Sequence, residues 1–256
     1  MIKEILKKVI KTEFRIKIRR NIFELKGLLH KGNKFYCICC NQSFNKFLSF
    51  GNEKREDAQC PSCGSLERTR LLNYYLINET DIFFDNKSIL HFAPESMLSK
   101  SLKKSSNKYL SVDIQKGYAD KIEDIQNLTF EDCAYDYIIC SCVLGHIPDE
   151  KKAIDELYRV LKIGAKAYIL TVINLNVYET LEDSSAISDE QRLKLFGEKD
   201  LLRLHGTDFI ERLKRSKVSV KQIDYSLNFS LHDRRRFSFG NKERELIFEI
   251  EKIKQD

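Results

Sequence analysis

The sequence predicts an α/β protein in which a doubly wound, mostly parallel sheet of seven strands follows a small cysteine-containing module. From Lys87 onward, short runs of β-branched and aromatic residues alternate with segments of helical periodicity. The run from Tyr135 to Cys142 is almost continuously apolar, as in the buried centre of a parallel sheet. Two C-x-x-C pairs before residue 65 predict the module.

The predicted elements follow one another in the order that such a sheet needs. We expect strands at 87–92, 109–112, just before Asp124, and at 135–142, 167–173, 218–225 and 245–251, with helices at 66–76, 98–104, 153–161 and 208–215. Lys162 and Gly164 suit the C-terminal end of the helix at 153–161. A loop without a helix separates the last two strands, so we expect the last strand to run antiparallel at one edge.

Composition limits the class of protein. With 256 residues and 42% apolar content, the chain can bury one ordinary core and carry an appendage. No apolar run approaches 18 residues, and Lys and Arg interrupt the first thirty residues too often for a secretory segment. We therefore expect a cytoplasmic protein without a transmembrane segment. In a reducing compartment, the eight cysteines are metal ligands or buried thiols.

Positive charge is concentrated at the N-terminus. Residues 1–36 hold eleven Lys or Arg and three Glu, a net charge of +8, whereas the whole chain carries +6. Helical spacing of the apolar residues of 2–10 predicts a basic N-terminal helix, and apolar and basic residues alternate at 14–19. Such an arm suits contact with nucleic acid or an anionic membrane, or forms a solvated face on a helix packed against its own domain. Both interpretations stay open.

The strongest local signal is the pairing of Cys37 with Cys40 and of Cys60 with Cys63, with nineteen residues between the pairs. Two such knuckles can present four thiolates to one tetrahedral ion, and this favours Zn²⁺ in a structural site, because no coordination position stays open for water. The alternatives are unmetallated thiols or an iron–sulfur cluster. Cys39 is a fifth thiol, which the two-residue spacing leaves out. We assign the module to 37–83 and interpret the later cysteines as core residues: Cys133, Cys140 and Cys142.

Several segments after residue 84 then resemble one family. They are Asp113 at the end of the second strand, 124–130, 134–141 and the helix segment 157–162, in that order. Together they are similar to the class I S-adenosylmethionine-dependent methyltransferases, of the methyltransferase type 11 kind, which implies a Rossmann-like domain over 84–256. The resemblance implies that Asp113 accepts hydrogen bonds from the cofactor ribose, that Asp124 and Ile125 lie beside the adenine, and that Ser141 faces the cofactor pocket.

The chain departs from the family's first motif, a glycine-rich turn. Here the first strand runs into a segment without glycine, and the cofactor-binding candidates in it are His91, Phe92, Ala93 and Glu95. A dinucleotide would need glycines for close approach to its pyrophosphate. S-adenosylmethionine has no phosphate, and Glu95, His91 and nearby carbonyls can hold its zwitterionic end. Gly145 also stands where many relatives have Glu, and 163–165 replaces a Pro-Gly-Gly turn.

Three further stretches resemble a subgroup with an N-terminal cysteine module: 60–70, 91–95, and the run from 178 to 209. Methyl transfer requires an aligned nucleophile and, for some acceptors, a base. The candidate bases are His146 and His205, and Glu179 is a candidate for orienting the substrate. We expect transfer to a small molecule or glycan, because 174–205 is long enough to form a lid. The alternatives are methylation of ribosomal RNA and a non-catalytic zinc-ribbon binding protein with a degenerate methyltransferase domain.

Overall fold

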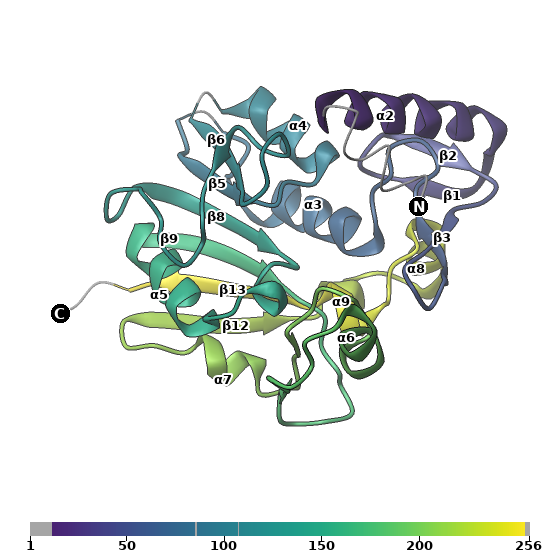
Figure 1. Ribbon diagram of the computed structural model, residues 1–256. Coiled ribbons are helices and arrows are strands. Elements are labelled where there is room, and N and C mark those ends of the chain that lie inside the picture. Colours follow the sequence, from purple (N-terminus) through teal and green to yellow (C-terminus); the bar gives the residue numbers. More distant parts are fainter. Residues whose placement is uncertain (1–11, 85, 107, 254–256) are drawn as a thin grey trace.

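The computed structural model describes residues 12–84, 86–106 and 108–253. Its centre is a seven-stranded sheet in the order β12-β13-β9-β8-β5-β6-β7, whose strands lie one below another in Figure 1, with β12 lowest. All neighbouring strands run parallel except at β13, which is antiparallel to both β9 and β12. The strands are β5 (Ile89–Phe92), β6 (Tyr109–Asp113), β7 (Lys121–Ile122), β8 (Tyr135–Ser141), β9 (Leu161–Leu170), β12 (Val218–Ile223) and β13 (Ile247–Lys252). The predicted mostly parallel sheet with an antiparallel last strand is confirmed.

Helices cover both faces of this sheet, each over its own apolar core. On one face α5 (Glu150–Val160) and α7 (Phe209–Leu213) pack against residues that include Ile138, Ile169 and Phe248. On the other face α3 (Glu67–Glu79) and α4 (Ser96–Ser105) pack against residues that include Ile139 and Tyr168. Alternate residues of β8 and β9 therefore face opposite cores, which is why these strands read as continuous apolar runs.

Two boundary predictions are wrong. The last two strands are separated by helical segments: a 3₁₀ turn η2 (Tyr225–Asn228), α8 (Leu231–Phe237) and α9 (Lys242–Glu245). They do pair antiparallel, but β13 lies inside the sheet and β12 forms the edge. The helix before β9 ends at Val160, and Gly164 belongs to β9. Pairing jumps from Leu161 to Lys166 along β9, so the intervening residues bulge out, and Gly164 takes its left-handed φ of 76° in that bulge.

The segment from Asn174 to His205, which we call the lid, packs on the turn that follows β8. It contains β10 (Leu181–Glu182), α6 (Asp189–Phe196) and β11 (Arg203–Leu204), with a small core of its own around Phe196 and Leu201. Buried Arg203 donates hydrogen bonds to the carbonyl oxygens of Leu144, Ile147 and Pro148 just after β8. This guanidinium fastens the lid to the sheet.

The N-terminal part lies over the same end of the sheet (Figure 1). It comprises α2 (Thr12–Leu29), the hairpin β1 (Lys31–Cys37) with β2 (Gln42–Phe44), and the hairpin β3 (Leu48–Phe50) with β4 (Arg55–Gln59). The apolar and basic alternation at 14–19 lies within helix α2, so its strand-like pattern is misleading. The predicted helical spacing at 2–10 lies outside the described residues.

Candidate functional site

Three strand ends meet at the point where the strand order reverses. β5 lies between β8 and β6, with Phe92 paired to Cys140 on one side and to Val112 on the other. The chain passes from β5 to β6 and β7 on one side and returns to β8 on the other, so these strand ends form the switch point at which open α/β sheets bind ligands, and we call this place the crevice. The topology therefore brings together the predicted residues at the ends of β5, β6 and β8.

The turn after β5 is built without glycine. Ala93 has a left-handed φ of 44°, and its backbone N–H donates to the Val112 carbonyl at 2.9 Å. His91 is fully buried, with Nδ1 3.0 Å from the hydroxyl of Tyr109 and Nε2 2.9 Å from Glu95 Oε2. Because both ring nitrogens have protein partners, His91 positions Glu95 and has no free nitrogen for a ligand.

Glu95 presents an unsatisfied oxygen at this edge. Its Oε1 is buried and has no hydrogen-bond partner, and the same holds for Ser141 Oγ at the end of the adjacent strand. Burial alone would raise the pKa of the Glu95 carboxyl, but the hydrogen bond with His91, the nearby Arg68 cation and the neighbouring Ser141 hydroxyl hold the pKa below its usual value. An ionised carboxylate with a free lone pair is suited to receive an ammonium group.

Asp113 ends β6 one strand away. Its Oδ1 accepts a 2.7 Å hydrogen bond from the Gln115 backbone, which fixes the carboxylate at the strand end. Asp124 forms a similar turn, with Oδ1 accepting from the Gln126 backbone at 2.9 Å. The side chains of Phe92 and Ile125 are buried in the core, so these two residues can offer only backbone groups to a ligand.

Two arginines at this site were missed by the sequence analysis. Arg68 on α3 and Arg244 on α9 each have a buried Nε without a partner. Burial by itself would lower the pKa of Arg68, but acidic neighbours that include Cys142 and Glu95 raise it above the ordinary value. In the sequence analysis, Arg68 is assigned only to the predicted helix at 66–76. The feature that could have indicated a functional role is its position, five residues after the second C-x-x-C pair.

The three predicted catalytic side chains differ in burial and in hydrogen bonding. His205 is buried, with Nε2 2.6 Å from Glu150 and Nδ1 2.9 Å from Thr171, so both nitrogens are held in a structural contact. Burial is the main reason that the pKa of His205 lies below its ordinary value. Glu179 is exposed on the loop after β9. His146 follows β8 in a 3₁₀ turn and is partly exposed, with only Nδ1 bonded, to the Asp200 carbonyl at 3.0 Å.

Gly145 has a steric explanation. A Cβ at this position would lie 2.7 Å from a methyl carbon of Leu201 in the lid. The lid therefore packs directly on the turn after β8, and a glutamate at position 145 would push it away. The departure from the family pattern is matched by the packing of this chain.

The four predicted metal ligands converge. The thiol sulfurs of Cys37, Cys40, Cys60 and Cys63 all lie within 4.8 Å of one another, with the Cys37–Cys63 pair at 3.6 Å and the Cys40–Cys60 pair at 3.8 Å. Tetrahedral Zn²⁺ with Zn–S bonds of about 2.3 Å separates its sulfurs by about 3.8 Å. The donor set and its spacing therefore fit zinc. Cys39 Sγ is not one of these four sulfurs: it neighbours Cys37 and lies 4.0 Å from the Thr69 carbonyl.

The three cysteines after the module differ in burial. Cys140 is buried in β8, as predicted, and Cys142 follows that strand with partial exposure. Cys133 is exposed, with Sγ 3.4 Å from Lys252 Nζ, so its assignment to the core is wrong. It precedes β8 on the surface, where no apolar layer covers it.

The cysteine module is joined to the crevice through α3. The hydroxyl of Ser65 lies 3.3 Å from Cys37 Sγ and 3.1 Å from Cys63 Sγ. Fully buried Arg70 donates hydrogen bonds to carbonyls on both sides of the junction: Ala58, Ser65, Phe237 and Ser238. The same helix carries Arg68, so the cysteine cluster and the crevice share one rigid element.

Comparison with known proteins agrees with the sheet topology. Residues 92–169 match the family model for a methyltransferase domain. The chain is 33% identical over 73 residues to arsenite methyltransferase from Rattus norvegicus, covering 28% of this chain and 18% of that enzyme. It is 34% identical over 64 residues to the enzyme of the same name from Aquipseudomonas alcaligenes, covering 25% and 18%. The alignments thus span less than a fifth of these relatives.

Solved structures share the fold at low identity. The [4+2]-cyclase SpnF has a TM-score of 0.52 at 10% identity, covering 82% of this chain and 88% of that chain. The YcgJ protein from Bacillus subtilis has a TM-score of 0.48 at 12% identity, covering 73% and 98%. Residues 92–169 thus resemble a methyltransferase domain, and the strand order is that of a doubly wound α/β sheet. A cyclase among proteins of this fold shows that the sheet alone does not fix the reaction.

Proposed function

We propose that this protein transfers a methyl group from S-adenosylmethionine to a small-molecule or glycan acceptor and that a structural zinc ion holds its N-terminal module. The observation that carries the proposal is the pair of buried, unpartnered groups, Glu95 Oε1 and Ser141 Oγ, on adjacent strand ends, with the Asp113 carboxylate one strand away. Buried polar groups without partners are rare in native structures, and a bound ligand is a common explanation.

The crevice offers a matching group for each polar part of this cofactor. The Glu95 carboxylate can accept from its ammonium group, and the free lone pairs of Asp113 can accept from its ribose hydroxyls. Arg68 can pair with a carboxylate, and the Asp124 carboxylate is our candidate acceptor for the adenine amine. When bound, the cofactor supplies a methyl group activated by a sulfonium centre.

The chain's own contribution to transfer is alignment and exclusion of water. The lid is held on the turn after β8 through Arg203, and an acceptor bound between the lid and this turn would be oriented and shielded from water. If the acceptor must lose a proton, His146 is the better base of the two predicted histidines, because its Nε2 has no bonded partner among the described residues.

Calorimetric titration of the zinc-loaded protein with S-adenosylmethionine tests the proposal. We expect micromolar binding that Asp113→Ala weakens and that Asp155→Ala, an exposed acid on α5, leaves unchanged. S-adenosylhomocysteine release over an acceptor library then tests transfer. A folded protein that does not bind the cofactor would contradict the proposal and favour a non-catalytic binding role.

A further inference from the structure

Helix α2 carries an apolar face that points away from the rest of the protein. Residues three and four apart share one side of a helix. Around exposed Asn21, this side of α2 carries six apolar residues whose exposed fractions range from 39% to 75%: Phe14, Ile18, Ile22, Leu25, Leu28 and Leu29. We call these six residues the apolar face of α2. An exposed apolar surface of this extent on one helix indicates an interaction site.

The opposite side of α2 makes the contacts with the body of the protein. A Cβ on buried Gly27 would lie 2.7 Å from the Cβ of Ser62, between the cysteines of the second knuckle. The ring of Phe23 lies directly against Gly64. The helix is thus held with its apolar face outward, at the periphery in Figure 1. The body of the protein packs against the side facing Gly27 and leaves the apolar face uncovered.

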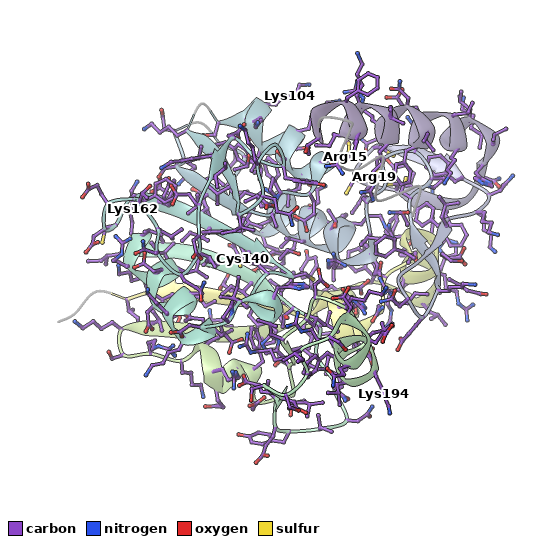
Figure 2. The ribbon with its side chains drawn as sticks, in the orientation of Figure 1. Arg15, Arg19, Lys104, Cys140, Lys162 and Lys194 are labelled. Atoms are coloured by element: carbon purple, nitrogen blue, oxygen red, sulfur yellow. The ribbon has the colours of Figure 1, made fainter. Side chains whose placement is uncertain are left out.

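Cations border the apolar face. Lys17 follows one margin, and Arg15, Arg19 and Lys26 follow the other. Figure 2 shows Arg15 and Arg19 on the side of α2 toward the rest of the protein, where the cations of Arg19 and Lys26 lie over the ring of Phe23. The one acid among the described side chains of the helix, Glu24, lies two turns after Lys17 on the same margin and is 3.8 Å from Arg20. Cations outnumber this acid along the helix, and an apolar stripe with a net basic border is complementary to an anionic lipid surface.

Two observations limit the kind of partner that can bind the apolar face of α2. Among the described residues no helix has the length and apolar composition to cross a bilayer, so α2 can lie on a membrane but cannot span one. The exposed apolar residues are aliphatic apart from Phe14, whereas single-stranded nucleic acid is bound by several aromatic stacking platforms. The surface suits acyl chains better than bases.

We propose that the apolar face of α2 docks this protein onto an anionic membrane surface, with the helix axis in the plane of the interface. The proposal is independent of methyl transfer. It has a consequence for the site, because Thr12 at the start of α2 packs on Gly117 in the loop that follows Asp113. Docking would therefore hold the crevice beside the lipid headgroups.

Co-sedimentation of the full chain with vesicles tests this docking. We expect binding to phosphatidylcholine vesicles that contain phosphatidylglycerol, weaker binding to pure phosphatidylcholine, and a decrease as salt is added. Ile18→Ser with Leu25→Ser should lower the partition coefficient about tenfold or more. The matched control is Ile187→Ser with Leu227→Ser, two exposed apolar residues outside α2, and it should bind as the unaltered protein does.

Charge reversal at two places tests whether the cations of α2, and not the charge of the whole protein, attract the anionic vesicles. Lys17→Glu with Lys26→Glu should weaken binding to anionic vesicles, whereas Lys151→Glu with Lys194→Glu, on α5 and α6, should change it little. No binding of the folded protein to anionic vesicles at low salt would overturn the proposal. It would also be overturned if Ile18→Ser with Leu25→Ser left vesicle binding intact. If these substitutions instead converted a dimer into a monomer in sedimentation without vesicles and did not change vesicle binding, the apolar face of α2 would be an interface between two copies of this chain.

Discussion

His91 and Glu95 form a buried pair across the turn that ends β5, with Nε2 2.9 Å from Oε2. The contact directs one carboxylate oxygen to the histidine and leaves the other, Oε1, without a partner at the crevice. In families with a glycine-rich turn, backbone groups line this position. Here a side-chain pair lines it, and Ala93 takes the left-handed conformation that glycine would otherwise supply.

Replacement of Glu95 tests the cofactor site most directly. Glu95→Gln keeps the size of the side chain and removes its charge, so we expect affinity for S-adenosylmethionine to fall about tenfold or more, as when a charge-assisted hydrogen bond is lost. Since the pKa of Glu95 lies below its ordinary value, affinity should stay constant from neutral pH down to about pH 5. Calorimetry at several pH values measures both effects. Unchanged affinity in the variant would exclude Glu95 as a ligand group.

Metal content tests the cysteine cluster. We expect one zinc ion per chain by mass spectrometry, lost in Cys60→Ser and retained in Cys39→Ser, because Cys39 Sγ lies outside the cluster. Removal of the ion by a chelator should lower the midpoint of thermal unfolding, since metal binding stabilises only the folded module. Iron with visible absorbance, or a metal-free protein of equal stability, would contradict the zinc assignment.

Arg68 and Arg70 lie on the same helix, but we expect Arg70 to stabilise the fold and Arg68 to bind the cofactor or the acceptor. Arg70→Met removes the guanidinium that donates to four carbonyl groups, two of them in buried hydrogen bonds, so we expect the free energy of unfolding to fall by about 3 kcal/mol or more. Arg68→Met removes a buried cation that has no partner at Nε, so the protein should fold with little loss and bind cofactor or acceptor more weakly. Urea unfolding and calorimetry of both variants measure the contrast. A large stability loss in Arg68→Met, with normal binding, would reverse these roles.

Periodicity and motif order were sufficient to predict the sheet, because its central strands are apolar on both faces and its helices amphipathic. Helix termini were harder to predict. Gly164 has the residue type of a helix terminus, yet the register jump between Leu161 and Lys166 uses it in a bulge. The alternation at 14–19 reads as a strand, but α2 is helical and packs through Gly27. The bulge at Gly164 and the helix at 14–19 both depend on contacts between segments that are distant in the sequence, and local patterns do not contain these contacts.

The candidate site was predictable where a residue's role follows from its strand position. Asp113 and Ser141 lie at the strand ends that the sequence analysis gave them. His205 shows the limit, because its partners Glu150 and Thr171 lie 55 and 34 positions away and no spacing relates them. Arg68 was missed for the same reason, since what distinguishes it is burial without a partner.

The buried His205 predicts a loss of stability in mild acid. Its pKa in the folded protein is lowered, mainly by burial, so below its unfolded pKa of about 6.5 the unfolded chain binds a proton that the folded chain does not. Stability should therefore fall as the pH decreases from about 7, by about 1.4 kcal/mol for each pH unit in which only the unfolded chain is protonated. Glu150 is charged throughout this window, because its pKa in the folded protein is also lowered: burial alone would raise it, but contacts with His205 and Arg212 outweigh burial.

Urea unfolding between about pH 7 and pH 5.5 measures this dependence. We expect His205→Gln to be less stable than the unaltered protein at pH 7 and to lose less stability on acidification, because the titrating group is gone. The control is His232→Gln, whose histidine is exposed in α8 and should not alter the slope. Equal slopes for the unaltered protein and His205→Gln would mean that His205 is protonated equally in both states, and a base role for it beneath the lid would be open again.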